Sequence, residues 1–378
     1  MPETFLPIDL DLDYLPHFPA KTDYGIGCIG AGFIMRDIHL VAYKNAGFHV
    51  VALASRSPEN ARAVARIRNI PKVYDSWQTL LDDPHVEIVD IAFPPDLQHD
   101  IIREAVRRPH IRAILAQKPL AMNYLEACQI VQLCEHSGKK LGVNQNMRYD
   151  QSIRALKTLL KRGILGSPVL ATIELRAIPH WQTFLQNYNR LTLLNLSIHH
   201  LDCFRFLFGD PERVFASACP DPRLKHKHRD GIALYILEYA NGLRATSWDD
   251  VWTGPTRDGA LGAPSIQWRV EGSEGCAWGT IGWPDYPEGS PSTLNFTSRQ
   301  QPSYIFQPRW KERWFPDAFE GTMAQLMRAV YEDGDPEISG QDNLKTMALV
   351  DACYKSLDEH RAVALAEITG NGIDSEKP

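Results

Sequence analysis

The sequence lacks the marks of several large protein classes. Its seven cysteines are scattered and form no CxxC pair, so we expect neither a disulfide framework nor a metal site. No apolar run reaches the roughly 18 residues that a membrane span needs. The net charge is −6 and no basic stripe is present, which argues against a nucleic-acid surface. We therefore expect a cytoplasmic protein that binds neither nucleic acid nor a membrane.

What the sequence does have is 378 residues, enough for two domains. Residues 1–21 are acidic and contain prolines, without the basic start and apolar run of a signal peptide, and are predicted to form an N-terminal arm. Across residues 22–146, short apolar runs alternate with helical patterns, as in an α/β domain whose parallel sheet is covered on both faces. Residues 147–378 are predicted to form an α+β domain on an open, mostly antiparallel sheet, with closing helices at 315–366.

A glycine-rich turn follows the first apolar run. Gly30 and Gly32 stand between that predicted strand and a helix that opens with Phe33 and Ile34. In this context Gly30 permits a tight turn, and Gly32 lets the backbone approach a pyrophosphate resting on the helix start. Met35 replaces the third glycine of the usual pattern, so a purely structural turn is the alternative. The strand–helix alternation that follows favours a dinucleotide-binding Rossmann domain.

The end of the second predicted strand bears on the choice of dinucleotide. A carboxylate there would bind the ribose 2′-hydroxyl of NAD, whereas an arginine accommodates the 2′-phosphate of NADP. The sequence has Ser55 and Arg56 and no acid at this point. This favours NADP modestly, and NAD stays possible if Arg56 only stacks on the adenine. Phe93 and Pro94, which follow a later strand, are further cofactor-binding candidates.

Two motifs could carry proton chemistry. Gln117-Lys118-Pro119 lies at the end of an apolar strand, where open α/β sheets bind ligands, and a buried lysine there could move the proton of an alcohol. On a predicted helix from Leu191 to Phe208, Asn195, His199 and Asp202 are spaced to share one face. His199 could relay a proton with Lys118; a metal ligand or a satisfied core histidine is the alternative.

Aromatic and polar residues gather in the second half of the chain and suit the binding of sugar rings. Packing at a sheet edge is the alternative interpretation. The predicted substrate-binding members of this group are Arg176, His180, Trp181, Trp248 and Asp250.

Together these motifs resemble the Gfo/Idh/MocA family of oxidoreductases, over roughly residues 24–367. The family pattern runs from a glycine-rich turn to a Glu-Lys-Pro triplet and an Asp-x-Gly-x-His-x-x-Asp helix. The resemblance implies that Lys118 and His199 are catalytic and that Lys118 also contacts cofactor and substrate. The segment Asn146-Met147-Arg148-Tyr149 is similar to the family's Asn-x-Arg-aromatic segment, which implies cofactor binding by Asn146 and substrate binding by Arg148.

The sequence departs from the family pattern at several positions. Gln117, a predicted cofactor contact, replaces the usual glutamate, and Asn195, a predicted substrate contact, replaces the usual aspartate. Gln98 falls where the family has a loop histidine and is also assigned to the cofactor. Without a carboxylate at 117, Lys118 is expected to be neutral more readily.

The resemblance implies an NAD(P)-dependent oxidoreductase acting on a hydroxyl of a sugar, polyol or sugar derivative. It also permits a glycosidase that uses NAD by transient oxidation, elimination and re-reduction, for example on an anionic sugar such as a sulfoquinovoside. A non-catalytic dinucleotide sensor is the third possibility. A homodimer or homotetramer is expected, because the family associates through the outer face of its C-terminal sheet. The particular sugar, the reaction direction and the choice of NAD or NADP stay open.

Overall fold

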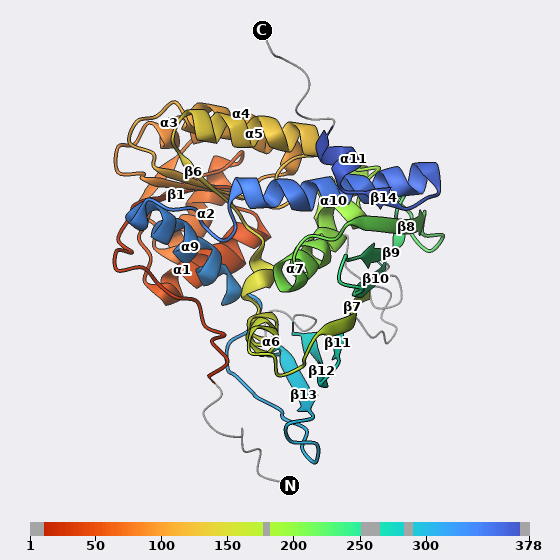
Figure 1. Cartoon of the computed structure of the whole chain (residues 1–378). Coiled ribbons are helices and arrows are strands. Elements are labelled where there is room, and N and C mark those ends of the chain that lie inside the picture. Colours follow the sequence, from red (N-terminus) through yellow and green to blue (C-terminus); the bar gives the residue numbers. More distant parts are fainter. Residues whose placement is uncertain (1–10, 177–181, 251–264, 283–289, 371–378) are drawn as a thin grey trace. The chain divides into compact units, whose positions relative to one another are not determined.

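The computed structural model describes residues 11–176, 182–250, 265–282 and 290–370 (Figure 1). The chain divides into two compact units. One, here called the parallel-sheet unit, comprises Pro16–Tyr149 and Phe315–Met347. The other, the mixed-sheet unit, comprises Met1–Leu15, Asp150–Trp314 and Ala348–Pro378. None of the helices in the described segments combines the length and apolar character of a membrane span.

The parallel-sheet unit contains a six-stranded sheet in the order β3-β2-β1-β4-β5-β6, all strands parallel. Strands β1, β4 and β5 are buried along their whole length, which is why they read as uninterrupted apolar runs. This order is that of a Rossmann fold, and the predicted fold class is confirmed. The strands are β1 (Ile26–Ile29), β2 (Val50–Ala54), β3 (Lys72–Tyr74), β4 (Ile88–Ile91), β5 (Ala113–Ala116) and β6 (Lys140–Val143).

Helices connect these strands and begin where the sequence supplies caps. Ser57 accepts a hydrogen bond from the Asn60 amide at the start of α2, with Pro58 in the first turn. Asn123 caps α5 in the same way through the Glu126 amide. The helical segments are η1 (Ile34–His39, a π-helix), α1 (Leu40–Ala46), α2 (Pro58–Arg68), α3 (Trp77–Leu81), α4 (Pro95–Ala105), α5 (Tyr124–His136) and η2 (Asn146–Tyr149, a 3-10 helix).

The domain boundary differs from the expected one near the end of the chain. Helix α9 (Ala318–Glu332) contacts β5, β6 and α1, so it belongs to the parallel-sheet unit and not to the second domain. The boundary then falls inside α10 (Gly340–Glu359). The physical reason is that α9 buries its apolar side against the parallel sheet, which its amphipathic pattern alone could not reveal.

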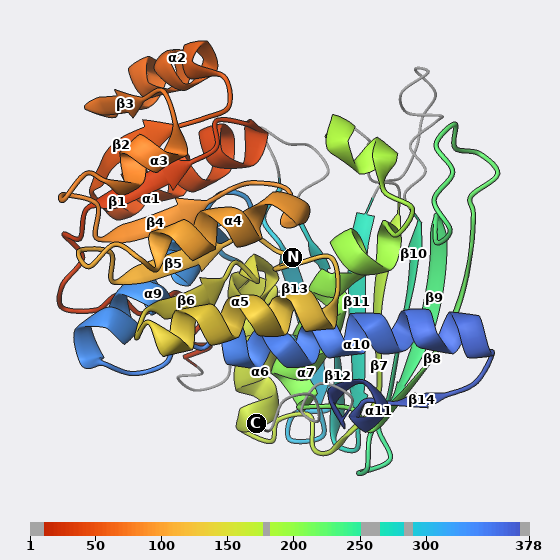
Figure 2. The same ribbon diagram turned by 90° about the horizontal axis from the view of Figure 1, so that it is seen from above.

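The mixed-sheet unit contains an eight-stranded sheet in the order β13-β12-β11-β7-β10-β9-β8-β14. Within the described residues β7 and β10 are the one parallel pair and the other neighbours are antiparallel, as predicted. Figure 2 shows these strands side by side. They are β7 (Pro168–Arg176), β8 (Arg213–Cys219), β9 (Ile232–Glu238), β10 (Arg244–Asp250), β11 (Ser265–Gly272), β12 (Gly275–Ile281), β13 (Thr293–Ser298) and β14 (Val363–Ala364).

Side chains alternate along these strands between a covered face and an open face. The covered face packs against helices, with η4 against β9 and β10 and α6 against β12 and β13. The open face keeps Leu234 and Ile236 almost half exposed. The helical segments of this unit are α6 (Gln151–Lys161), η3 (Thr183–Asn187, a 3-10 helix), η4 (Thr192–Ser197, a π-helix), α7 (Ile198–Phe208) and α11 (Ala366–Thr369).

Candidate active site

The glycine-rich turn joins β1 to η1 in a conformation that suits only glycine at its first position. Gly30 has φ +119°, and a Cβ there would lie 2.6 Å from the Ala92 carbonyl oxygen. At Gly32, by contrast, a Cβ would meet nothing within 4 Å. The space beside Gly32 is therefore not required for internal packing and fits a closely approaching ligand backbone such as a pyrophosphate. Phe33 and Ile34 open the helical segment beside it, as predicted for the cofactor turn.

The end of β2 presents the residues that would meet an adenosine ribose. Ser55 is half-buried and Arg56 is exposed, with its guanidinium 5.6 Å from the centre of the Phe93 ring. Pro94 directly follows Phe93 and precedes the first residue of α4. Arg56, Phe93 and Pro94 thus lie near one another, and Arg56 has a cationic side chain with room to meet a phosphate.

The end of β5 carries Gln117 and Lys118, both half-buried. Burial lowers the pKa of Lys118 to about 7, because removing the ammonium from water disfavours its charged form. Gln117 Oε1 accepts a hydrogen bond from the Lys118 backbone amide at 2.9 Å. Lys118 is therefore poised to gain and lose a proton near neutral pH.

Gln98 holds this strand end from α4. Its Oε1 accepts from the Gln117 amide at 2.7 Å, and its Nε2 donates to the carbonyls of Gln117 and Pro119 at 2.9 and 3.0 Å. The side chain is fully buried and supports the end of β5, and its predicted contact with the cofactor stays a prediction.

A buried histidine that did not stand out in the sequence lies beside this strand end. The His39 Nδ1 is 2.7 Å from Asp90 Oδ2, which also accepts from the Tyr43 hydroxyl at 2.7 Å. Its Nε2 faces the Asn144 Nδ2 at 3.0 Å and the Gln117 Nε2 at 3.4 Å. The available signal was Asp90, a carboxylate inside an apolar strand, because a buried charge needs a partner.

The segment at the domain junction has a structural role. Arg148 is 4% exposed and donates to the Glu337 carbonyl at 2.9 Å and to the Asp342 carboxylate at 2.5 Å. Asn146 is 2% exposed and donates to the Asn144 carbonyl at 3.2 Å. The resemblance implies substrate binding by Arg148 and cofactor binding by Asn146, and both stay predictions. The structure shows the Arg148 guanidinium bound to groups nearly two hundred residues away in the chain.

In the mixed-sheet unit, the predicted helix from Leu191 to Phe208 is divided into the π-helical η4 and the α-helical α7. Asp230 accepts hydrogen bonds from the Leu191 and Leu193 amides at 2.9 and 2.8 Å and so caps η4. Asp249 on β10 holds the junction of the two helices, because it accepts from Ser197 and lies 3.1 Å from His200 Nδ1. His200 is therefore a satisfied core histidine.

Of the predicted residues on this helix, Asn195 and His199 are 7% and 9% exposed, and Asp202 is 1% exposed. Asp202 lies 4.0 Å from the Arg205 guanidinium. The His199 imidazole contacts the Trp314 ring edge to face, with ring centres 5.7 Å apart. His199 thus keeps a small exposed fraction and is otherwise buried.

Arg176, Trp248 and Asp250 lie on the open face of the mixed sheet, opposite the face that η4 and α7 cover. The Arg176 guanidinium stacks 2.9 Å from the Trp248 ring centre. Asp250 forms a 2.8 Å ion pair with Arg223. The sheet therefore separates these residues from His199, because alternation puts Asp249 and its neighbours Trp248 and Asp250 on opposite faces. The predicted substrate residues His180 and Trp181 lie outside the described residues.

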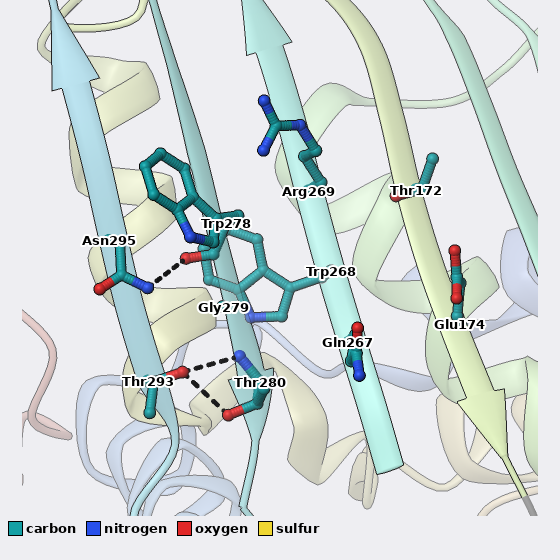
Figure 3. Close-up of a pocket in the computed structure, with 10 residues that line it drawn as sticks. All are labelled: Thr172, Glu174, Gln267, Trp268, Arg269, Trp278, Gly279, Thr280, Thr293 and Asn295. Atoms are coloured by element: carbon teal, nitrogen blue, oxygen red, sulfur yellow. Dashed lines mark hydrogen bonds between the residues drawn. The ribbon is translucent and has the colours of Figure 1, made fainter.

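The open face also carries a hollow of about 380 Å³ formed by β7, β11, β12 and β13 (Figure 3). The Arg269 guanidinium lies 5.4 Å from the centre of the Trp278 ring, and Thr280 and Thr293 are hydrogen-bonded to each other at 2.8 Å. None of the predicted site residues lines this hollow. Across the described residues, no three His, Cys, Asp or Glu side chains form a group that could hold a metal ion.

Two family models match the chain. That of an oxidoreductase family with an NAD-binding Rossmann fold matches residues 24–145, and that of the C-terminal alpha/beta domain of the same family matches residues 157–365.

Individual proteins of known name are similar over most of their length. D-apiose dehydrogenase of Paraburkholderia graminis is 28% identical over 349 residues, covering 90% of this chain and 89% of that protein. 1,5-Anhydro-D-fructose reductase of Ensifer adhaerens is 25% identical over 85% of this chain and 92% of that protein. An oxidoreductase from Agrobacterium radiobacter, solved with NAD+, L-tartaric acid and magnesium, superposes with a TM-score of 0.77 at 23% identity, over 92% of this chain and 100% of that one.

Proposed function

Since the chain belongs to the Gfo/Idh/MocA family of oxidoreductases, whose Rossmann domain binds NAD, we propose that it oxidises or reduces a hydroxyl-bearing carbon of a sugar, polyol or sugar derivative. A dinucleotide held on the turn at Gly30 and Gly32 would supply the hydride acceptor for the oxidation, and Lys118 would take the proton of the hydroxyl. In the reverse direction the same base returns the proton to the carbonyl oxygen.

The position and the lowered pKa of Lys118 are the main support for this proposal. It stands at the carboxyl end of a strand of the parallel sheet, where Rossmann folds bind their ligands. With a pKa of about 7, its amine is substantially neutral at physiological pH and can accept the proton of an alcohol. His199 is proposed as the second proton-handling group, and Asn195 as a contact for the substrate.

The cofactor is proposed to lie on the turn formed by Gly30 and Gly32. The open space beside Gly32 would take the pyrophosphate, and Arg56 and Phe93 would flank the adenosine. Ser55 and Arg56 supply no carboxylate for a 2′-hydroxyl, which supports a preference for NADP.

The sugar class is supported by the relatives, since D-apiose dehydrogenase and 1,5-anhydro-D-fructose reductase both carry a sugar substrate in their names. The test is to incubate the protein with free sugars and chromogenic glycosides, with NAD or NADP, and to follow reduced nicotinamide and released aglycone. We expect stoichiometric reduced cofactor from a free sugar, lost in Lys118→Met and kept in Lys161→Met, which alters an exposed lysine of α6.

Two other outcomes would overturn the proposal. Release of aglycone that requires NAD, with no accumulation of reduced cofactor, would establish a redox-neutral glycosidase. Tight dinucleotide binding without turnover of any compound would establish a sensor.

We further propose that the chain forms a homodimer or homotetramer through the open face of the mixed sheet. Leu234 and Ile236 are 48% and 44% exposed there, and Phe215, paired with Ile236 across the ladder, is 42% exposed. Ile236→Asp should yield a monomer in light scattering, whereas Tyr331→Asp on α9, also an exposed position, should leave the assembly intact. A monomeric wild-type protein would refute this proposal.

A further inference from the structure

We propose that His39 is a positioning residue for the reaction: held by Asp90 with its proton on Nδ1, it orients the Gln117 carboxamide and, through it, the peptide from which Lys118 extends. The inference rests on the proposed function of Lys118 as the acid–base group. His39 itself touches neither substrate nor cofactor in this account, since its side chain is fully buried.

Asp90 fixes the tautomer of His39. Its Oδ2 accepts from the Tyr43 hydroxyl and lies 2.7 Å from His39 Nδ1, a distance that requires a proton between the two atoms. Both side chains are fully buried, so no water competes for these positions. In a neutral imidazole with the proton on Nδ1, Nε2 is an acceptor.

The acceptor at Nε2 determines which way two amides point. The Asn144 Nδ2 donates to it at 3.0 Å, and the Gln117 Nε2 approaches at 3.4 Å, near the outer limit of a hydrogen bond. Even at this distance, electrostatic repulsion would oppose the reversed orientation of the Gln117 carboxamide. A reversed carboxamide would set its oxygen against the Nε2 lone pair and its NH₂ group against the Lys118 amide hydrogen.

One further hydrogen bond connects the orientation of the Gln117 carboxamide to the backbone of Lys118. With its NH₂ group toward His39, Gln117 turns Oε1 to the Lys118 amide at 2.9 Å. Gln98 meanwhile holds the amide and carbonyl of Gln117 itself. The backbone at residues 117 and 118 is thus held from α4 on one side and, through His39, from β4 on the other.

This arrangement explains why a glutamine suits position 117 in this chain. A glutamate would place a carboxylate against the unprotonated Nε2 of His39. His39 would then have to take a second proton on Nε2, or the side chain at 117 would have to turn away. Gln117 makes its two contacts without adding a charge beside Lys118.

The first test needs no substrate. It measures which ring nitrogen of His39 carries the proton and whether the Lys118 backbone amide changes its environment. In protein labelled with ¹⁵N at histidine and lysine, we expect His39 to show a protonated Nδ1 and an unprotonated Nε2, with assignment by its disappearance in His39→Gln. Gln117→Glu should either protonate Nε2 or, if the glutamate side chain turns away, shift the Lys118 amide signal. The Lys118 amide signal should shift in His39→Leu and stay near its wild-type position in His39→Gln, because glutamine carries both a donor and an acceptor. A proton on Nε2 in the wild type would overturn the inference.

The second test measures kcat and dinucleotide affinity. His39→Leu should lower kcat by about 10²-fold, the order of loss expected from a misplacement of about 1 Å, while dinucleotide affinity changes little. His39→Gln should restore most of the loss. Equal kcat in both variants and the wild type would overturn the positioning role. If His39→Leu does not fold, Gln117→Glu replaces it, and an unprotonated Nε2 together with an unshifted Lys118 amide signal in that variant would refute the coupling.

The two proposals can fail separately. If the wild-type protein neither oxidises nor reduces any sugar, polyol or sugar derivative, the proposed function falls. The ¹⁵N signals of His39 and Lys118 still decide whether His39 orients Gln117.

Discussion

Replacing Lys118 by methionine should make the protein more stable at pH 6 while abolishing its activity. The pKa of Lys118 is about 7, against 10.5 for a lysine in water, and each whole pKa step corresponds to about 1.4 kcal/mol. Keeping the ammonium in its buried position therefore costs at most about 5 kcal/mol of folding free energy. Methionine is of similar length and carries no charge, so it avoids this cost.

The folding free energy that the charged Lys118 costs decreases as the pH rises. Below pH 7 the lysine is charged in both the folded and the unfolded chain, and the full cost applies. Between pH 7 and 10.5 the unfolded chain binds a proton that the folded chain does not, so the stability of the wild type rises with pH. Above pH 10.5 both forms are neutral and the cost vanishes.

The assay is urea denaturation of wild type, Lys118→Met and the exposed control Lys161→Met, at intervals from pH 6 to pH 10.5. The stability gained by Lys118→Met should be largest at pH 6 and should decline steadily above pH 7, whereas Lys161→Met should track the wild type throughout. A gain that does not change with pH, or no gain at all, would refute the burial of a proton-exchanging amine at position 118.

Three further predictions concern the cofactor turn, the ribose end and the histidine helix. Gly30→Ala should destabilise the protein, because its Cβ would lie 2.6 Å from a carbonyl oxygen, whereas Gly32→Ala should melt like the wild type and lose dinucleotide affinity; calorimetry and fluorescence titration distinguish the two. Arg56→Ala should raise KM for NADP with little effect on NAD, and an equal change for both would contradict a phosphate contact. Asp249→Ala should cost about 1–3 kcal/mol in urea denaturation, because Ser197 and His200 lose a buried acceptor; unchanged stability would show that other groups hold the helix.

The fold could be predicted because it depends on local patterns. Apolar runs of strand length, helix caps such as Ser57 and the turn at Gly30 are all visible within a few residues of sequence. Helix α9 was harder to place, because its partners β5 and β6 lie about two hundred residues earlier and only contact reveals them.

The candidate site could be predicted only where a residue's role depends on its own strand or turn. Lys118 follows directly after a buried strand, so its position at the sheet edge could be inferred, although its catalytic role stays a prediction. The role of His39 could not be predicted, because its partners are Asp90 on β4 and Asn144 directly after β6, both distant from it in sequence. The buried hydrogen bonds of Arg148 could not be predicted for the same reason, because its partners at 337 and 342 are distant in sequence.

The register of strand β10 limits insertions and deletions in the turn that joins it to β9. Asp249 points to the helix side of the sheet only because the turn between β9 and β10, with hydrogen bonds joining Tyr239 to Gly242 and to Leu243, sets the register of the ladder. Inserting or deleting a single codon in that turn would exchange the two faces of β10. Ser197 and His200 would lose their carboxylate, and Trp248 would be driven under the helices. We therefore expect the turn to resist any change in length, and also the substitution of Gly242, whose φ is +91°.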